Sequence, residues 1–208
     1  MLGAMPIFRP FRKETFWRDL LVIQGGFALF GLSIALMIRA NLGTSSWSVL
    51  EVALANRLSV TPGTMAIAMG FFVLGISIAL REEIGWGTLA NIVCIGLWID
   101  AFLYVIPSID DNLILQIAML VVPIPLQGLA SGLYIGVDAG AGPRDSLMLA
   151  IHRTTGLSIR VARISVEVTV VLIGWLLGGP VGFGTLVFAL LIGPAVQWGF
   201  RVCKVKGH

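Results

Sequence analysis

Polar side chains that could bind a solute gather at two breaks in an otherwise apolar chain. Arg39 precedes the run Asn41-Leu42-Gly43-Thr44-Ser45-Ser46, and Arg144 and Asp145 follow the run Asp138-Ala139-Gly140-Ala141-Gly142-Pro143. Each break leads into a short apolar segment, where we expect helices over 45–58 and 143–155, capped by Ser45 or Ser46 and begun by Pro143. The free N–H groups and positive dipole at such helix starts attract anionic groups. The breaks therefore predict a site for an anionic or zwitterionic solute, formed by Arg39, Asn41, Ser45, Ser46, Gly142, Arg144 and Asp145.

Three ionisable residues lie within long apolar segments. Arg163 and Glu167 are four residues apart, so a helix places them on one face, where their charges can neutralise each other. Asp100 has no opposite charge one turn away. Ionisable groups inside a membrane are candidates for function, and Asp100 and Glu167 are the candidates for proton coupling. The alternative for Arg163 and Glu167 is a pair that only anchors the end of a helix.

The sequence lacks the familiar catalytic and nucleotide-binding motifs. It contains no HExxH, no GxSxG and no Gly-rich stretch that ends in Gly-Lys-Ser or Gly-Lys-Thr, so zinc hydrolysis, serine hydrolysis and P-loop binding of ATP are not indicated. Cys94 and Cys203 have neither CxxC spacing nor clustered His beside them, which argues against a disulfide or a metal site. We therefore expect no enzyme activity, no metal and no cofactor.

The composition places these residues in a membrane. Of the 208 residues, 57% are apolar and 12% are charged, against roughly 25% charged in soluble domains. Too few polar residues remain to cover a water-soluble surface, whereas a bilayer solvates apolar faces directly. A crossing helix needs about 20 predominantly apolar residues. Six segments come close to that length and predict an all-α membrane protein with six spans: 19–38, 62–80, 86–106, 113–137, 160–178 and 183–203.

The distribution of Lys and Arg predicts the orientation of the chain. If the basic tail over 1–18 and the tail over 204–208 are cytoplasmic, twelve of the 14 Lys and Arg residues lie on that side, and only Arg39 and Arg57 lie outside. We therefore expect a protein of the bacterial cytoplasmic membrane with both termini inside, in contact with anionic lipid. Nucleic acid is not expected as a partner, because no basic groove with interleaved aromatic residues is evident.

An internal repeat divides the chain into two halves. A shift of 97 residues superimposes Gly31 on Gly128 and the run 85–89 on 182–186. The halves, 19–107 and 113–203, each hold three spans and one short helix, so the second half must enter the membrane upside down. Inverted repeats recur in transporters, where the solute binds near the midplane at broken helices. Small residues are expected to let spans one and four approach closely: Gly31, Ala35, Gly128, Gly132 and Gly136.

Two interpretations of the short helices remain open. They are re-entrant half-helices whose starts face a shared cavity, or amphipathic helices that lie in the two membrane interfaces with Trp47 as an anchor. The first interpretation predicts a transporter or channel for a small solute. The alternatives are a non-transporting regulatory protein that binds a partner or lipid, and the substrate-binding subunit of a larger importer. A homodimer or a larger membrane complex is compatible with each.

Three runs of the sequence carry a family resemblance. They are Gly31-Leu32 with Met37-Ile38-Arg39-Ala40-Asn41-Leu42-Gly43-Thr44-Ser45, then Gly132-Leu133-Tyr134-Ile135-Gly136 with Ala141-Gly142-Pro143-Arg144-Asp145, then Gly178-Gly179-Pro180-Val181-Gly182-Phe183-Gly184-Thr185-Leu186. On these runs the chain resembles the YczE-type family of bacterial integral membrane proteins, which is related to the YitT and YyaS groups. Relatives carry Pro and Asp around the first-copy Trp, where this chain has Ser46 and Ser48. The resemblance implies a multi-pass protein of the cytoplasmic membrane and implies no biochemical activity.

Overall fold

The structure is a computed structural model that describes residues 14–82, 84–140 and 142–205, most of which lie in helices. The prediction of an all-α protein is confirmed, and the helices begin and end within a few residues of the expected bounds. The greater part of the two predicted tails, 1–13 and 206–208, lies outside the described residues. In chain order the helices are α1 (Phe16–Ala40), α2 (Ser46–Leu58), α3 (Pro62–Ala79), α4 (Trp86–Val105), α5 (Leu113–Val121), α6 (Pro123–Gly136), α7 (Pro143–Thr155), α8 (Ile159–Leu176) and α9 (Phe183–Val202).

Five helical segments of the described chain are long and apolar enough to cross a bilayer: α1, α3, α4, the pair α5 and α6, and α9. The fourth predicted span is divided in two, because Pro123 has no backbone N–H to donate and begins a new helix, α6. α8 contains Arg160, Arg163 and Glu167, so it is less apolar than the other five, and the fifth predicted span, 160–178, stays a prediction. α2 and α7 have 13 residues each, which gives about 20 Å of helix, too short to cross.

Short polar signals determine where several helices begin. The hydroxyl of Thr61 accepts a hydrogen bond from the backbone N–H of Thr64 (3.1 Å), and the hydroxyl of Ser158 accepts one from Val161 (3.3 Å). These bonds satisfy N–H groups that have no partner inside the helix, and so they cap α3 and α8. Pro143 occupies the first turn of α7, as predicted.

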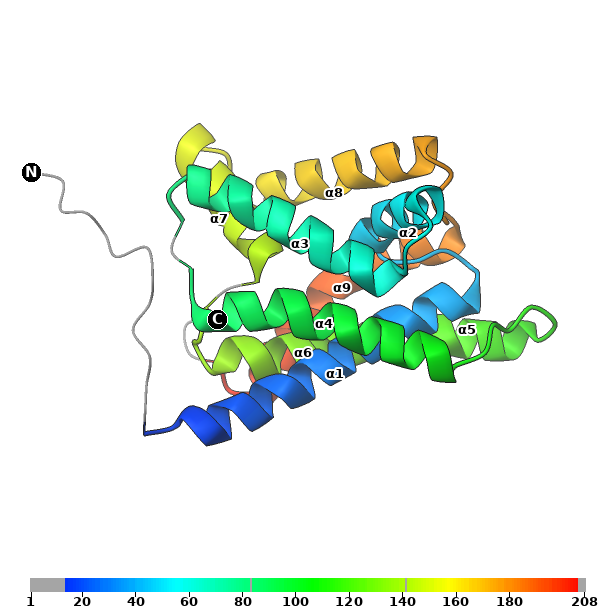
Figure 1. The fold of residues 1–208 in the computed structure, drawn as a ribbon, viewed down its shortest axis with the longest axis horizontal. Coiled ribbons are helices and arrows are strands. Elements are labelled where there is room, and N and C mark those ends of the chain that lie inside the picture. Colours follow the sequence, from blue (N-terminus) through cyan, green and yellow to red (C-terminus); the bar gives the residue numbers. More distant parts are fainter. Residues whose placement is uncertain (1–13, 83, 141, 206–208) are drawn as a thin grey trace, which may run out of the picture.

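The helices form two groups that face each other. In the first group, α4, α1, α6 and α9 pack in that order, each against the next. In the second group, α2 and α7 each contact both α3 and α8, which closes a ring. Figure 1 shows α1, α4 and α6 below the second group, and α3 joins the groups through its contact with α4. Each short helix therefore packs against one long helix from each half of the chain.

The two breaks make the same contact, 97 residues apart. Gly43 and Gly140 have φ angles of 104° and 127°, a conformation that any side chain would strain. A Cβ on Gly43 would meet the backbone of Gly182, and a Cβ on Gly140 would meet the backbone of Gly85. One backbone hydrogen bond holds each break to the start of a long helix: from Gly184 N–H to the Leu42 carbonyl (2.8 Å), and from Gly87 N–H to the Ala139 carbonyl (3.0 Å).

The small residues of the first and fourth spans lie at close helix contacts, but not mainly at the contact that the sequence predicted. α1 and α6 do pack against each other. However, a Cβ on Gly128 or Gly132 would meet backbone atoms of α9, and a Cβ on Gly31 would meet α4. Ala35 is fully buried, and Gly136 lies near the C-terminal end of the described chain, at Val205. The glycines thus bring α1 close to α4 and α6 close to α9.

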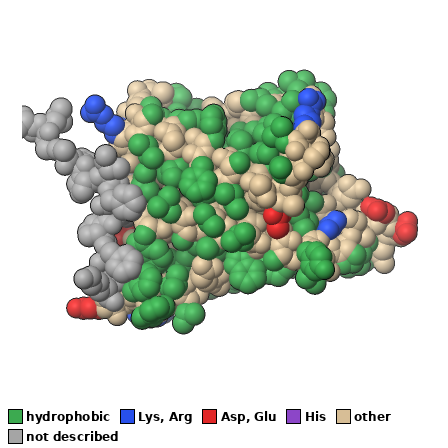
Figure 2. Space-filling view, in the orientation of Figure 1, with side chains coloured by type: hydrophobic (Ala, Val, Ile, Leu, Met, Phe, Trp, Pro, Cys, Tyr) green, Lys and Arg blue, Asp and Glu red, His purple; other side chains and the backbone are tan. Residues whose placement is uncertain are grey.

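The outer surface is predominantly apolar. Figure 2 shows apolar side chains spread over most of one face, with few charged side chains among them. Large apolar side chains such as Phe72, Leu190 and Ile114 are more than half exposed. Soluble proteins rarely expose apolar patches of more than a few hundred Å², so this surface suits lipid. Together with the five apolar helical segments, it makes the chain a multi-pass membrane protein.

Candidate functional site

A cavity of about 380 Å³ lies between the starts of the two short helices. Ser45 and Ser46 line it from the start of α2, and Gly142, Arg144 and Asp145 line it from the start of α7. Ser45 and Gly142 are the N-caps of these helices, so the first turns of both helices, whose N–H groups have no partner inside the helix, meet at this cavity. Five of the seven predicted binding residues are therefore brought together around one space. Their role in binding a solute stays a prediction.

Arg144 is held by two contacts with α2. Its guanidinium forms an ion pair with Glu51, whose side chain is only 2% exposed. The guanidinium carbon also lies 4.9 Å from the centre of the Trp47 ring, within the range of a cation–π contact. A buried carboxylate needs such a partner, because an unpaired charge is costly to bury. The positive charge of Arg144 is therefore already balanced, and the two contacts join the first turn of α7 to the first two turns of α2.

Asp145 belongs to a polar cluster beside the start of α7. The hydroxyl of Tyr134 donates a hydrogen bond to the Asp145 carboxylate, over 3.2 Å. A Cβ on Gly142 would lie within 4 Å of that hydroxyl, of the Asp145 carboxylate and of the side-chain oxygen of Asn91. All four residues line the cavity. Because glycine has no side chain, the polar atoms of this cluster remain accessible from the cavity.

The predicted pair of Arg163 and Glu167 is confirmed, with 2.9 Å between Nε and Oε1. Both residues line the cavity from α8. α8 therefore contributes a neutral ion pair to the cavity wall and no net charge.

Two buried polar atoms at the cavity have no hydrogen-bond partner among the described residues. They are the side-chain oxygen of Gln127 and the indole nitrogen of Trp47. Both residues line the cavity, and each is only 6% exposed. Buried polar groups are normally hydrogen-bonded, so this acceptor and this donor are exceptions, and both belong to residues of the cavity wall.

Arg39 and Asn41, which the sequence predicted as binding residues, do not line the cavity. Arg39 donates hydrogen bonds to the backbone carbonyl of Leu103 and to the hydroxyl of Ser108 (3.0 Å), and Asn41 donates one to Asp110 (3.3 Å). α1 ends with Asn41 in the left-handed conformation (φ 54°), and both side chains hold the loop between α4 and α5. Proximity in sequence to the break was a poor guide, because the chain turns sharply at that residue.

Asp100 does not line the cavity either. Its carboxylate accepts hydrogen bonds from the backbone N–H of Gly63 (2.8 Å) and from the hydroxyl of Thr61 (2.5 Å). A carboxylate at a helix start is stabilised by the free N–H groups and the dipole, so this contact ties the start of α3 to α4. The proton-coupling role of Asp100 stays a prediction.

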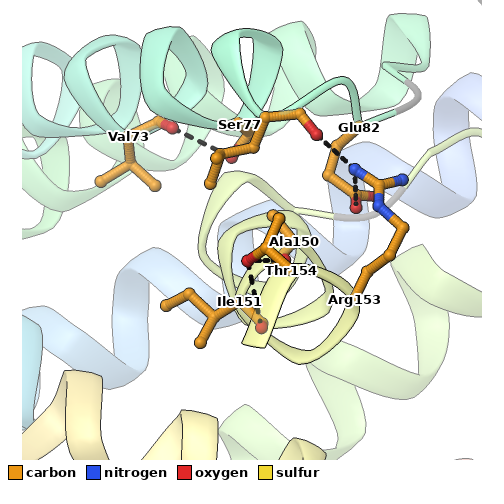
Figure 3. Close-up of polar contacts among 8 residues, drawn as sticks. Val73, Ser77, Glu82, Ala150, Ile151, Arg153 and Thr154 are labelled. Atoms are coloured by element: carbon orange, nitrogen blue, oxygen red, sulfur yellow. Dashed lines mark hydrogen bonds and ion pairs between the residues drawn. The ribbon is translucent and has the colours of Figure 1, made fainter. Parts of the chain in front are cut away.

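The C-terminal ends of the short helices are anchored in matching ways. Figure 3 shows Arg153 of α7 beside Glu82, with 2.9 Å between the charged groups, and Arg153 also donates to the backbone carbonyl of Leu80. In the other half, Arg57 of α2 donates to the carbonyl of Leu177 over 3.1 Å. Leu80 and Leu177 are the C-caps of α3 and α8. Each short helix is thus fixed at its far end to a long helix of the other half, while its start faces the cavity.

The sequence reasoning missed several polar residues of this site. Asn91, Gln127, Ser131 and Tyr134 line the cavity, and Glu51 balances Arg144. The available signal was polar side chains within long apolar segments, which are candidates for function even when they carry no charge.

Metal ligands are not clustered in the described part of the chain. No group of three or more His, Cys, Asp or Glu side chains that could hold a metal ion occurs within it. Cys94 and Cys203 are free thiols.

Residues 17–201 match the model of one protein family, described as a family of unknown function (DUF6198). The chain belongs to this family. It is 34% identical over 165 residues to the uncharacterized membrane protein YczE of Bacillus subtilis, which covers 79% of this chain and 76% of that protein. It is 32% identical over 192 residues to an uncharacterized protein of Haemophilus influenzae, covering 92% of this chain and 88% of that protein.

A third relative is the uncharacterized protein YyaS of Bacillus subtilis, 26% identical over 172 residues, covering 81% of this chain and 85% of that protein. The resemblance to YczE-type bacterial membrane proteins is therefore confirmed. No solved structure matches the chain significantly.

Proposed function

We propose that this chain is a membrane transporter for a small anionic or zwitterionic solute, which binds in the cavity between the starts of α2 and α7. The observation that carries the proposal is that the first turns of both short helices line one cavity of about 380 Å³. Free N–H groups at helix starts recognise carboxylates, and paired broken helices are a recurrent binding place in transporters. This geometry supports re-entrant half-helices over helices that lie in the interfaces. A solid helical core without a polar cavity would instead favour a regulatory protein that transports nothing.

Matched contacts support an inverted repeat of three spans in each half. α2 packs on α8 while α7 packs on α3, and α1 packs on α4 while α6 packs on α9. The anchoring bonds from Arg57 to Leu177 and from Arg153 to Leu80 follow the same exchange between halves. Helices that are related in this way can change partners by the rocking of one half against the other.

One difference in contacts between the two halves supports alternating access. α3 packs tightly on α4, where a Cβ on Gly96 would meet the carbonyl of Gly63. The matching glycine of α9, Gly193, has no atom within 4 Å of an added Cβ, and α8 and α9 make little contact over the described residues. In the proposed mechanism the cavity is closed between α3 and α4 and open between α8 and α9. Rocking would exchange these two conditions.

The orientation and the energy source are part of the same proposal. With both termini in the cytoplasm, α8 begins and α9 ends at the cytoplasmic face, so the open side faces the cytoplasm. Asp100 holds the closed side through Gly63, and Glu167 lies on the open side, paired with Arg163. Protonation of Asp100 would weaken the contact that holds the closed side, and protonation of Glu167 would release Arg163 at the open side. Either step would couple proton binding to the exchange of states.

Uptake into proteoliposomes tests the proposal. A panel of labelled organic acids, amino acids and betaines is offered to vesicles that contain the full chain, its Arg144→Ala variant, or Arg201→Ala as a matched control from an exposed position of α9. We expect uptake of at least one solute above that of empty vesicles, and a loss of about tenfold or more for Arg144→Ala only, in protein whose unfolding temperature shows that it is folded. If no solute enters, the proposed transport is wrong; if Arg144→Ala transports at the parent rate, the assignment of the site is wrong.

A further inference from the structure

The charges around the cavity cancel one another. Arg144 is paired with Glu51 and Arg163 with Glu167, which leaves Asp145 as the remaining carboxylate. The start of each short helix contributes about half a positive charge, so the two starts together offset Asp145. A solute with a net charge would bring an unbalanced charge into a poorly solvated space, which is unfavourable. A zwitterion would bring none.

The polar groups at the cavity are nevertheless of two kinds. The donors are the starts of α2 and α7 together with the indole N–H of Trp47, which has no partner among the described residues. The acceptors are the carboxylate of Asp145, the side-chain oxygen of Asn91 beside it, and the side-chain oxygen of Gln127, which also has no partner there. A carboxylate suits the donors, and an ammonium group suits the acceptors.

The two halves of the chain place different side chains at matched positions of the cavity wall. Asn91 corresponds to Phe188, and Gln127 corresponds to Phe30, each at the offset of 97 residues. All four residues line the cavity, so at each of these matched positions one side chain is polar and the other is apolar. A site of this kind suits a solute whose ends differ and which binds in one orientation.

An apolar wall completes the cavity on the side of α9. Phe188, Ile192, Val196 and Phe200 line it, and their spacing of four residues places them along one face of the helix. This wall is about 18 Å long at 1.5 Å per residue. It reaches the open side between α8 and α9, where Gly193 has no close neighbour, and it can accept an apolar side chain.

We propose that the solute is a zwitterion with an apolar side chain, of the class of the neutral, apolar α-amino acids. Its carboxylate lies at the start of α2 beside Trp47, its ammonium group lies between Asp145 and Gln127, and its side chain lies against α9. This assignment rests on the proposed transport site and narrows its solute to one charge type. The positive charge of Arg144 is not available to the solute, because Glu51 balances it.

Binding to the full chain in lipid nanodiscs tests the charge type. The ligands are L-leucine, 4-methylpentanoate, which lacks the ammonium group, and 3-methylbutylamine, which lacks the carboxylate. We expect saturable binding of leucine that is at least about tenfold tighter than that of either analogue. The assignment is overturned if either analogue binds as tightly as leucine, or if none of the three binds.

Two variants test the assigned residues. Asp145→Asn and Gln127→Leu each weaken leucine binding by about tenfold or more, whereas Asp110→Asn, in the loop after α4, leaves it unchanged. Unfolding temperatures of the three variants show whether each is folded. Unchanged leucine binding in folded Asp145→Asn and Gln127→Leu overturns the placement of the ammonium group.

The transport panel distinguishes a failure of the assigned solute class from a failure of the proposed transport. If another solute is transported while leucine does not bind, the solute class is wrong and transport stands; if leucine binds but never crosses, transport is wrong and the class stands.

Discussion

The guanidinium of Arg144 stacks on the ring of Trp47, with 4.9 Å between the guanidinium carbon and the ring centre. The two residues occupy the second position of α7 and of α2 and are 97 residues apart, the offset of the repeat. A residue thus touches its own counterpart from the other half. Such a contact is expected only close to the axis that relates the two halves, which places the cavity at the centre of the proposed repeat.

The pair of Arg144 and Glu51 is expected to stabilise the fold mainly by balancing a buried carboxylate. Arg144→Gln leaves Glu51 unpaired at 2% exposure, and we expect a loss of about 3 kcal/mol in the free energy of unfolding. The measurement is unfolding in detergent, followed by circular dichroism.

The double variant Glu51→Gln with Arg144→Gln provides the control for this prediction. It removes both charges, so most of the lost stability is expected to return. A double variant as unstable as Arg144→Gln would show that the contact with Trp47, and not the ion pair, accounts for the loss.

The two matching glycines of α4 and α9 are expected to respond differently to alanine. Gly96→Ala places a Cβ against the carbonyl of Gly63 and is expected to cost about 1 to 3 kcal/mol. Gly193→Ala meets no atom within 4 Å and is expected to be neutral or slightly stabilising, because alanine favours helix.

Uptake into proteoliposomes provides a second test of the glycines in α4 and α9. If α9 must close on α8 during transport, Gly193→Ala slows uptake while leaving stability unchanged. Normal uptake by a stable Gly193→Ala protein would argue against closure at this glycine.

The glycines at the two breaks are expected to be intolerant of side chains. Gly43→Ala and Gly140→Ala each place a Cβ on a backbone with positive φ and against another glycine backbone. We expect each to lower the free energy of unfolding by about 1 to 3 kcal/mol. Gly75→Ala is the control, since nothing lies within 4 Å of its added Cβ; equal losses in all three proteins would contradict the proposed role of the breaks.

The carboxylate of Asp100 is expected to hold the start of α3 against α4. Asp100→Asn weakens the bond to the backbone N–H of Gly63, at a cost of about 1 to 2 kcal/mol. Hydrogen exchange should therefore quicken in the first turn of α3, and not in α8. Asp110→Asn removes a carboxylate from a nearby loop and should leave exchange in α3 unchanged; the same acceleration in both variants would remove the special role of Asp100.

Most of the helices could be predicted from the sequence because each follows a local rule. Runs of apolar residues of bilayer length mark the long helices, and the glycine breaks with Pro143 mark the starts of the short ones. The kink between α5 and α6 was missed, although Pro123 signals it locally.

The candidate site could be predicted only in part from the sequence, because it depends on contacts between residues that are distant in sequence. Ser45, Ser46, Gly142, Arg144 and Asp145 follow from the breaks themselves and line the cavity. The partner of Arg144 could not be predicted, since Glu51 is 93 residues away and is brought near only by the packing of the two halves.

Arg39 and Asn41 were predicted as site residues, but they do not line the cavity. They flank the first break in the sequence, yet they bond the loop after α4, because the left-handed turn at Asn41 ends α1 at that point.

The most direct test of the account is whether water reaches the starts of the short helices from one side of the membrane. Ser46→Cys and Ser131→Cys place single thiols at the cavity wall, and Ser33→Cys places one in the fully buried face of α1, each in a chain that also carries Cys94→Ala and Cys203→Ala. A small, membrane-impermeant thiosulfonate is applied to vesicles of either orientation. The account predicts reaction of the first two thiols from the cytoplasmic side only, and no reaction of the third. Reaction of Ser46→Cys from the outside alone, as for a helix in the outer interface, or no reaction from either side, would contradict it.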